Sequence, residues 1–347
     1  MAALQLGLDT FGDITVDASG AMLTHAQSIR NIVDQAVLAD EVGLDFMGIG
    51  EHHRDDFAVS SPEMVLAAIA ARTSRIRLGS AVTVLSSDDP VRVFERFSIL
   101  DALSNGRAEV ILGRGSFTES FPLFGYDLAD YNQLFEEKIE LFAELLKEEP
   151  VTWSGQTRAA LSKQRVFPPS ESGTIPTWVG VGGSPESVVR AAHYGLPLML
   201  AIIGGDPLRF LPYVDLYKRA LAQGERAELP IAAHSPGHIA ATDEQAAEEL
   251  WPHFRASHER IGKERGWPTM GREEFDREVA DGAIFAGSPE TVAAKIVRTV
   301  QGLGLSRFDL KYATGTMPHE QLLSSIGLYG REVAPIVREK LAASTAE

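Results

Sequence analysis

Apolar residues along the chain follow two spacings that alternate from one end to the other. Short apolar runs are typical of buried strands, and longer segments with apolar residues every three or four positions are typical of amphipathic helices. In residues 24–42, for example, Ile29, Ile32 and Val33 share one helical face. Strands are predicted at residues 4–9, 46–49, 76–84, 108–112, 177–181, 197–202, 231–240 and 308–312. Helices are predicted at residues 24–42, 62–71, 91–103, 131–146, 186–193, 208–222, 244–259, 291–301 and 320–341.

This succession of strand–helix units predicts an α/β fold, a (β/α)8 TIM barrel, for which about 250 residues is typical. The chain has 347 residues, and we place the excess in insertions near residues 150–175 and 260–285. A doubly wound open sheet is the alternative, but such sheets seldom contain so many units in a row. Because no low-complexity segment or Pro/Ser-rich linker interrupts the pattern, residues 1–347 are expected to form a single domain.

Composition narrows the function classes. A hydrophobic fraction of 44% with 23% charged residues is typical of a globular protein in water. The net charge of −16 makes nucleic acid and membrane surfaces unfavourable partners. The chain has no cysteine, which excludes disulfides, thiolate metal sites and a cysteine nucleophile. The first residues do not have the pattern of a secretory signal, and no apolar stretch is long enough to span a bilayer, so a cytoplasmic location is expected.

The motif Glu51-His52-His53 follows the predicted second strand directly. Barrel active sites lie at the carboxyl ends of the strands, so this motif is expected at the functional rim. Adjacent residues of an extended segment point in opposite directions, and therefore only one histidine is expected to face the barrel mouth. A capped strand end and a proton-transferring site explain the pattern equally well. A metal site explains it less well, because the chain has no HExxH motif and no His-x-His on the first strand.

Two glycine-containing turns follow the fourth and fifth predicted strands. Arg114 lies between two glycines, and residues 181–186 read VGGSPE and start a helix. Exposed backbone N–H groups, a helix N-terminus and a guanidinium all favour phosphate. Neither turn is a dinucleotide fingerprint, because Thr118 and Pro185 stand where the third glycine should be. Together the turns predict a site for one monophosphate, although a surface loop and a well-capped helix would explain each turn separately.

Small residues also mark the outer end of the predicted third strand, Gly79–Val82. Small side chains at that place would let a flat ligand approach the backbone. Close packing of the barrel strands is the simpler explanation of the same residues.

Four stretches taken in order resemble the luciferase-like flavin monooxygenase family. They read GLDFMGIGEHH, SSPEMVLAAIAARTSRIRLGSAVTVL, DPVRVFERFSILDALSNGRAEVILGRGS and IPTWVGVGGSPESVVRAAHYGLPLML. The ordered set is specific to that family, whereas any one stretch is not. The resemblance implies a (β/α)8 barrel that binds reduced FMN and activates O2 to oxygenate a small organic substrate. It also implies a separate flavin reductase that supplies the reduced cofactor.

The resemblance further implies roles for individual residues. The family's catalytic histidine corresponds to His52, and its flavin-ring platform, often a cis peptide, corresponds to Ala81 and Val82. The phosphate ligands correspond to Arg114, Gly183, Ser184 and Ser187. His52 would control protonation of the oxygen intermediate or act as a base on the substrate. His238, near the end of the seventh predicted strand, is a second pocket candidate, although a polar strand residue explains it equally well.

The chain departs from the light-emitting members at two positions. Gly113 stands where they tend to carry a cysteine, and Gly183 stands where one has an acidic residue. Neither light emission nor an aliphatic aldehyde substrate is therefore expected. The substrate depends on the loops at 117–126 and 260–285, whose shapes the composition does not define.

Three other functions are compatible with the same residues. The first is a deazaflavin-dependent dehydrogenase of the same superfamily, the second is a metal-dependent hydrolase built on Glu51, His52 and His53, and the third is a flavin-binding protein without turnover. A homodimer is expected, because the predicted helix at 91–103 is apolar on more than one face and the resemblance implies dimers through this region. A long loop that covers the outer face is the alternative explanation.

Overall fold

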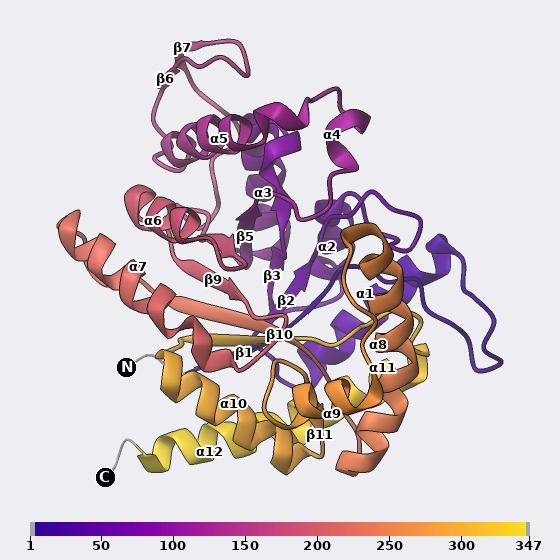
Figure 1. Ribbon diagram of the computed structural model, residues 1–347. Helices are drawn as coiled ribbons and strands as arrows, with labels where there is room; N and C mark the ends of the chain where they lie inside the picture. Colours follow the sequence, from indigo (N-terminus) through magenta and orange to yellow (C-terminus); the bar gives the residue numbers. More distant parts are fainter. Residues whose placement is uncertain (1–3, 345–347) are drawn as a thin grey trace.

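Eight parallel strands close into a barrel in this computed structural model, which describes residues 4–344 (Figure 1). In order around the barrel they are β1 (Gln5–Thr10), β2 (Phe46–Ile49), β3 (Arg77–Ser80), β5 (Ala108–Gly113), β8 (Thr177–Val181), β9 (Leu198–Ala201), β10 (Ile231–Ile239) and β12 (Arg307–Lys311). The last strand pairs back onto β1, with Arg307 opposite Gln5. This closure confirms the predicted (β/α)8 barrel and excludes the open sheet.

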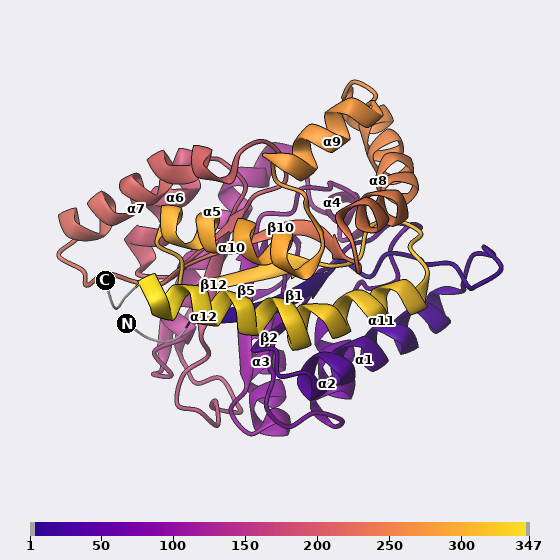
Figure 2. The same cartoon turned by 90° about the horizontal axis from the view of Figure 1, so that it is seen from below.

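Helices cover the outside of the barrel (Figures 1 and 2). They are α1 (His25–Glu41), α2 (Pro62–Ala70), α3 (Pro90–Ser104), α5 (Tyr131–Leu145), α6 (Pro185–Tyr194), α7 (Leu211–Gln223), α10 (Pro289–Leu303), α11 (His319–Leu328) and α12 (Ala334–Ser344). A π-helical turn, Tyr329–Val333, joins α11 to α12. The two helices form one long rod in Figure 2, where the pattern predicts a single helix.

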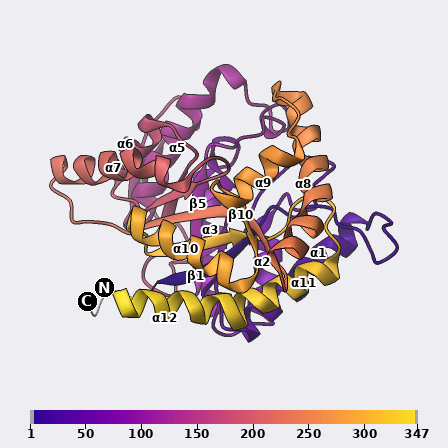
Figure 3. The ribbon, with the colours of Figure 1, turned by 60° about the horizontal axis from the view of Figure 1, so that its bottom comes forward.

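Two stretches stand outside the strand–helix repeat. After α5, β6 (Val151–Trp153) and β7 (Leu161–Gln164) form an antiparallel hairpin that projects beyond the barrel (Figure 1). After β10, the long helix α8 (Asp243–Arg265) and the shorter α9 (Arg272–Ala280) stand at one side (Figure 3). The short strand β11 (Phe285–Gly287) then pairs with β10. The pattern does not predict α9, because Phe275 is its only buried residue and apolar spacing is nearly absent.

The structure divides the predicted third strand into two. β3 ends at Ser80, and β4 (Thr83–Val84) pairs separately with β5. Ala81 and Val82 lie between the two pieces. A short helix, α4 (Ser120–Leu123), follows β5, and single 3-10 turns occupy Leu85–Ser87, Leu128–Asp130 and Pro207–Phe210.

The hydrophobic core has two parts. The larger part fills the space between the outer faces of the strands and the surrounding helices. The smaller part lies inside the barrel and consists of Phe46, Ala81, Ile111, Trp178, Met199 and Ala232. Within residues 4–344, no helix combines the length and the apolar character needed to cross a bilayer.

Arg307 is fully buried in the barrel interior. Its guanidinium lies 4.0 Å from the centre of the Phe46 ring and 4.5 Å from that of Trp178. It pairs with Glu109, and its Nε lies 3.1 Å from Asp309 Oδ2. A buried charge is tolerated only when it is paired. Glu109 and Asp309 supply that pairing for the guanidinium of Arg307 inside the barrel.

Replacing Arg307 by Met should lower the free energy of unfolding by about 3–5 kcal/mol, because Glu109 and Asp309 would lose the cation that they share. Arg338→Met is the matched control. Its ion pair with Asp45, at 3.0 Å, is exposed, and its loss should cost less than about 1 kcal/mol. Denaturant unfolding followed by circular dichroism measures both changes. Equal losses in the two variants would contradict the prediction.

Candidate active site

The Glu51-His52-His53 motif follows β2 at the carboxyl end of the barrel. The backbone N–H of Glu51 donates to the Val82 carbonyl at 3.2 Å, and that of His52 donates to the Val59 carbonyl at 2.9 Å. These bonds hold the motif between the broken third strand and the loop that precedes α2. The two imidazoles consequently face different surroundings.

The His52 ring lies among aromatic side chains. Its centre is 4.5 Å from that of Phe57, 4.9 Å from that of Phe117 and 5.0 Å from that of Phe11. Its Nε2 is buried and has no hydrogen-bond partner among the described residues. Burial, with a further effect from the positive charge of Lys311, lowers the pKa of His52 to about 3. The imidazole is therefore neutral at pH 7 and has a lone pair that can accept a proton.

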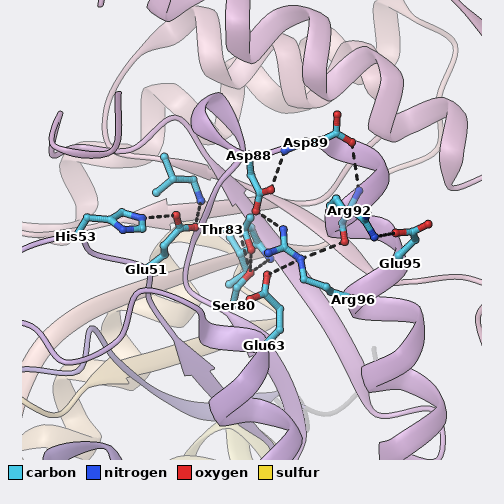
Figure 4. Close-up of polar contacts among 12 residues, drawn as sticks. Glu51, His53, Glu63, Ser80, Thr83, Asp88, Asp89, Arg92, Glu95 and Arg96 are labelled. Atoms are coloured by element: carbon cyan, nitrogen blue, oxygen red, sulfur yellow. Dashed lines mark hydrogen bonds and ion pairs between the residues drawn. The ribbon is translucent and has the colours of Figure 1, made fainter. Parts of the chain in front are cut away.

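The His53 ring has a polar partner instead. Its Nε2 is bonded to Glu51 Oε1 at 2.8 Å, and Glu51 Oε2 accepts the backbone N–H of Val84 at 2.8 Å (Figure 4). One carboxylate thus fixes His53 and ties the end of β2 to β4. In the part of the chain that the structure describes, no three histidine, cysteine or acidic side chains are grouped as a metal ion would require. The motif therefore supports proton handling better than metal binding.

An ion-pair cluster supports this region from behind (Figure 4). Arg96 of α3 pairs with Asp88 and lies 3.6 Å from Glu63 of α2. Burial raises the pKa of Glu63, although the charge of Arg96 opposes the shift. Asp89 accepts the backbone N–H of Val91 at 2.9 Å and so caps α3. These contacts join α2, α3 and the segment after β4, on which the rim is built.

The peptide bond between Ala81 and Val82 is cis, as the resemblance implies for this place. Glycines on neighbouring strands make room for the two side chains. A Cβ on Gly48 would lie 2.8 Å from the Ala81 Cβ, and one on Gly113 would lie 2.5 Å from a Val82 methyl. The Cys-to-Gly difference at Gly113 is thus accounted for by packing, because a larger residue would collide with Val82.

The two predicted anion turns meet around one carboxylate. Ser184 caps α6, and its hydroxyl donates to Glu186 Oε2 at 2.7 Å. This hydrogen bond is the main cause of a lowered pKa of Glu186, and the positive charges of Arg114 and Arg190 add to it. Arg114 and the α6 N-terminus therefore act electrostatically on the same exposed anion. We call Arg114 together with residues 183–187 the cradle. The Arg114 guanidinium itself donates to Asn132 Oδ1 at 3.3 Å, and Arg190 Nε pairs with Glu136 Oε2 at 2.5 Å.

The remaining residues of the cradle are backbone groups and a buried hydroxyl. Gly183 has a φ of 123°, which only glycine adopts readily, and its carbonyl accepts the Tyr213 hydroxyl at 2.8 Å. Ser187 is buried on the first turn of α6, and its hydroxyl accepts from Arg190 at 3.4 Å. The Arg114 guanidinium lies 5.4 Å from the centre of the Tyr131 ring. The free N–H groups of this turn and the helix dipole favour an anion further.

Loops from three strands close over the mouth. Arg54 donates to Glu119 at 2.5 Å and to Glu264, near the end of α8, at 2.6 Å. The Arg265 guanidinium donates to the Ser116 carbonyl at 2.8 Å. Behind these bonds, the cavity beside His52 measures only about 10 Å³, which is about the space of one water molecule. A larger ligand can reach His52 only when this closure opens.

A larger depression, of about 590 Å³, lies at the opposite end of the barrel. Residues at the starts of the strands line it, including Gln5, Arg77 and Thr177. Catalytic groups of (β/α)8 barrels come from the other end, so its size alone does not make it the active site.

Of the two histidines of β10, the sequence suggests His238 and not His234 as a pocket candidate. His238 is fully buried, and its Nε2 is bonded at 2.6 Å to Glu249 of α8. His234 of the same strand is instead bonded through Nδ1 to Asp9 Oδ2 of β1 at 2.8 Å. Sequence analysis missed this pair. The only signs of this pair in the sequence are Asp9 near the end of the first predicted strand and His234 within the seventh predicted strand.

Comparisons with known proteins agree with this geometry. The family model described as luciferase-like monooxygenase matches residues 10–307. An N-acetyl-S-alkylcysteine monooxygenase of Bacillus subtilis is 28% identical over 293 residues, which are 79% of this chain and 84% of that protein.

Two solved structures share the fold. The oxygenating constituent of 3,6-diketocamphane monooxygenase from Pseudomonas putida, in complex with FMN, is 20% identical with a TM-score of 0.78, over 96% of this chain and 98% of that one. The coenzyme F420 dependent tetrahydromethanopterin reductase of Methanopyrus kandleri is 19% identical with a TM-score of 0.71, over 96% and 99%. Because the family model covers most of its length, this chain belongs to the luciferase-like monooxygenase family of flavin-dependent oxidoreductases.

Proposed function

We propose that this chain is the oxygenating component of a two-component, FMN-dependent monooxygenase. It takes reduced FMN from a separate flavin reductase and uses O2 to oxygenate a small organic substrate. The observation that carries the proposal is the start of α6, where the Glu186 carboxylate accepts the Ser184 hydroxyl at 2.7 Å and the positive charges of Arg114 and Arg190 help to lower its pKa. A phosphate monoester has the charge and size to replace that carboxylate.

The residues present fit FMN in two respects. Arg114, Gly183, Ser184 and Ser187 would hold its phosphate. Ala81 and Val82 would support one face of its ring system, at the break between β3 and β4. When bound in reduced form, FMN would supply the two electrons that O2 needs. Proton transfer and the exclusion of water would depend on residues of the protein.

His52 accepts and returns a proton at its buried Nε2. That atom has no partner among the described residues, so it is free to bond a reactant. Phe11, Phe57 and Phe117 surround the ring and would exclude water, which suppresses side reactions at the site. The Arg54 contacts to Glu119 and Glu264 would reclose the mouth after the ligands enter.

The nature of the cofactor remains a choice between FMN and a deazaflavin, because proteins that use F420 share the fold. Both carry phosphate, so the cradle suits either one. We favour FMN because the match to the oxygenase family is at the level of sequence, whereas the likeness to the F420-dependent reductase is one of fold.

Replacing Arg114 by Ala should weaken FMN binding roughly ten- to a hundred-fold, because a charge-assisted contact to phosphate is lost, at a cost of about 1.5–3 kcal/mol. Arg165→Ala removes the same charge from an exposed site after β7 and should leave binding unchanged. Equilibrium titrations with FMN, riboflavin and F420 measure these effects. Riboflavin, which lacks the phosphate, should bind both variants and the unmodified protein alike. If Arg114→Ala weakens the binding of riboflavin as much as that of FMN, Arg114 does not bind the phosphate.

Replacing His52 by Gln should leave FMN binding within about two-fold and reduce turnover by about 10²–10⁴-fold, the usual contribution of one acid–base group. His25→Gln changes an exposed histidine at the start of α1 and is the control. Reduced FMN, O2 and candidate substrates are supplied with a reductase, and product is separated from hydrogen peroxide by chromatography. Undiminished product from the His52 variant would remove this residue from the mechanism.

A homodimer is proposed through the outer face of α3. On this helix Ile99 is 48% exposed and Leu103 is 57% exposed, one turn apart, and Met64 on the neighbouring α2 is 74% exposed. Apolar side chains exposed side by side are typical of protein interfaces. No long loop of the described chain covers Ile99 and Leu103, which the alternative explanation requires.

The double variant Ile99→Lys and Leu103→Lys should therefore shift the protein from dimer to monomer, because two buried charges per subunit would face an apolar partner surface. Leu211→Lys, at a 39% exposed leucine of α7, is the control and should remain dimeric. Light scattering after size exclusion gives the masses. A dimer that survives the double substitution would exclude this face.

A further inference from the structure

A second histidine, His234, shares the aromatic neighbour Phe11 with His52. His234 of β10 is bonded through Nδ1 to Asp9 Oδ2 at 2.8 Å, and the two side chains are only 11% and 3% exposed. The Phe11 ring lies 6.3 Å from the His234 ring and 5.0 Å from the His52 ring. The two imidazoles thus share one aromatic neighbour, and neither His52 nor Nε2 of His234 has a side-chain hydrogen bond within residues 4–344.

The sequence builds this pair with a glycine. β12 lies between β10 and β1, with His234 opposite Asp309 and Asp309 opposite Gly7. A Cβ on Gly7 would collide with the Asp309 carboxylate. Gly7 leaves room for the buried carboxyl of Asp309. Asp9 of β1 and His234 of β10 then form their hydrogen bond across β12.

Charged groups act on His234 from β12, which pairs with β10, and from β1, which lies beyond β12. Asp9 comes from β1, and Asp309 and Lys311 come from β12, whereas β9 places Ala201 opposite. Burial alone would lower the pKa of His234, but the charge and hydrogen bond of Asp9, aided by Asp309, raise it above the ordinary value. Burial raises the pKa of Asp309 itself, although the charge of Arg307 opposes the shift. Asp9 makes the direct hydrogen bond to His234.

His52 has the opposite environment. Its neighbours are aromatic and its nearest charges are positive, which keeps it neutral. Where two titratable groups of one site are pushed in opposite directions, the environment has separated an acid from a base. Buried ionisable pairs usually cost stability, which favours a functional reason for keeping this one.

We propose that His234, oriented by Asp9, is the proton-donating partner of His52, so that an acid and a base flank Phe11 at the mouth. This inference rests on the proposed function for the reaction that uses the proton. In the step, the Nε2–H bond of the imidazolium breaks and the proton passes to a negatively charged oxygen of the bound reactants. The imidazole is left neutral, its Nδ1 keeps the hydrogen bond to Asp9, and water restores the proton after the mouth opens. No electron changes place.

The charge states can be tested without any cofactor. Histidine-labelled protein is titrated by NMR, with His52→Gln and His234→Gln used to assign the two rings. We expect His234 to titrate above about 6.5, the ordinary value, and His52 to stay neutral down to about pH 5. In the isosteric variant Asp9→Asn, the pKa of His234 should fall by about 1–3 units. A His234 that titrates at or below the ordinary value, or that ignores Asp9→Asn, overturns the proposal.

The role in the reaction is tested by the pH profile for oxidation of bound reduced FMN by O2, followed by the return of oxidised-flavin absorbance. His234→Gln should slow this reaction by about 10²-fold and abolish its dependence on the alkaline side. Asp9→Asn should shift that dependence to lower pH. His193→Gln, at an exposed histidine of α6, is the control. If the pH profile of His234→Gln superimposes on that of the unmodified protein, the proposal is overturned, because Asp9 and His234 then have only a structural role. If the unmodified protein binds no FMN, the proposed function fails, and the titration of His234 still decides whether the mouth holds an acid.

Discussion

Pairing of β1 with β12, in which Gln5 lies opposite Arg307, closes the barrel and sets all eight strands parallel around one axis. Everything proposed for the active site depends on that closure, because it brings the carboxyl ends of strands far apart in sequence to one rim. His52, the Ala81–Val82 peptide and Arg114 follow consecutive strands, β2, β3 and β5. The α6 N-terminus follows β8, the next strand along the rim. Inside the closed barrel, Arg307 and its carboxylate partners are buried away from water.

Elements with a regular apolar spacing could be predicted from the sequence to within a few residues. β2 and β8 coincide with the predicted ranges, and α1 and α5 differ by one residue at their ends. Several features could not be predicted, including the hairpin of β6 and β7 and the short strand β11. α9 has almost no apolar face, the break at Ala81 and Val82 leaves the apolar run intact, and the π-helical turn at Tyr329–Val333 does not disturb helical spacing.

The candidate site was predictable where chemistry is local in sequence and unpredictable where it depends on contact between distant strands. The glycine turn before Ser184 and the histidines after β2 each lie within a few residues. The pair of Asp9 and His234 joins residues 225 positions apart, and only the register of three strands brings them together. The same holds for the contact of Arg54 with Glu264, which closes the mouth from α8.

The closed mouth and the open cradle together describe a resting enzyme. The cavity at His52 measures only about 10 Å³, whereas the Glu186 side chain at the start of α6 is exposed and accepts the Ser184 hydroxyl. Under the proposed function, a phosphate-bearing cofactor would displace that carboxylate, and the contacts of Arg54 with Glu119 and Glu264 would have to open before a ligand reaches His52.

The most direct measurement is the crystal structure of this protein with FMN bound. The account predicts the phosphate within hydrogen-bond distance of Arg114 and of the backbone N–H groups at the start of α6, with Glu186 turned away from Ser184. A phosphate bound at any other place, or a complex in which the Glu186 carboxylate still accepts the Ser184 hydroxyl, would contradict it.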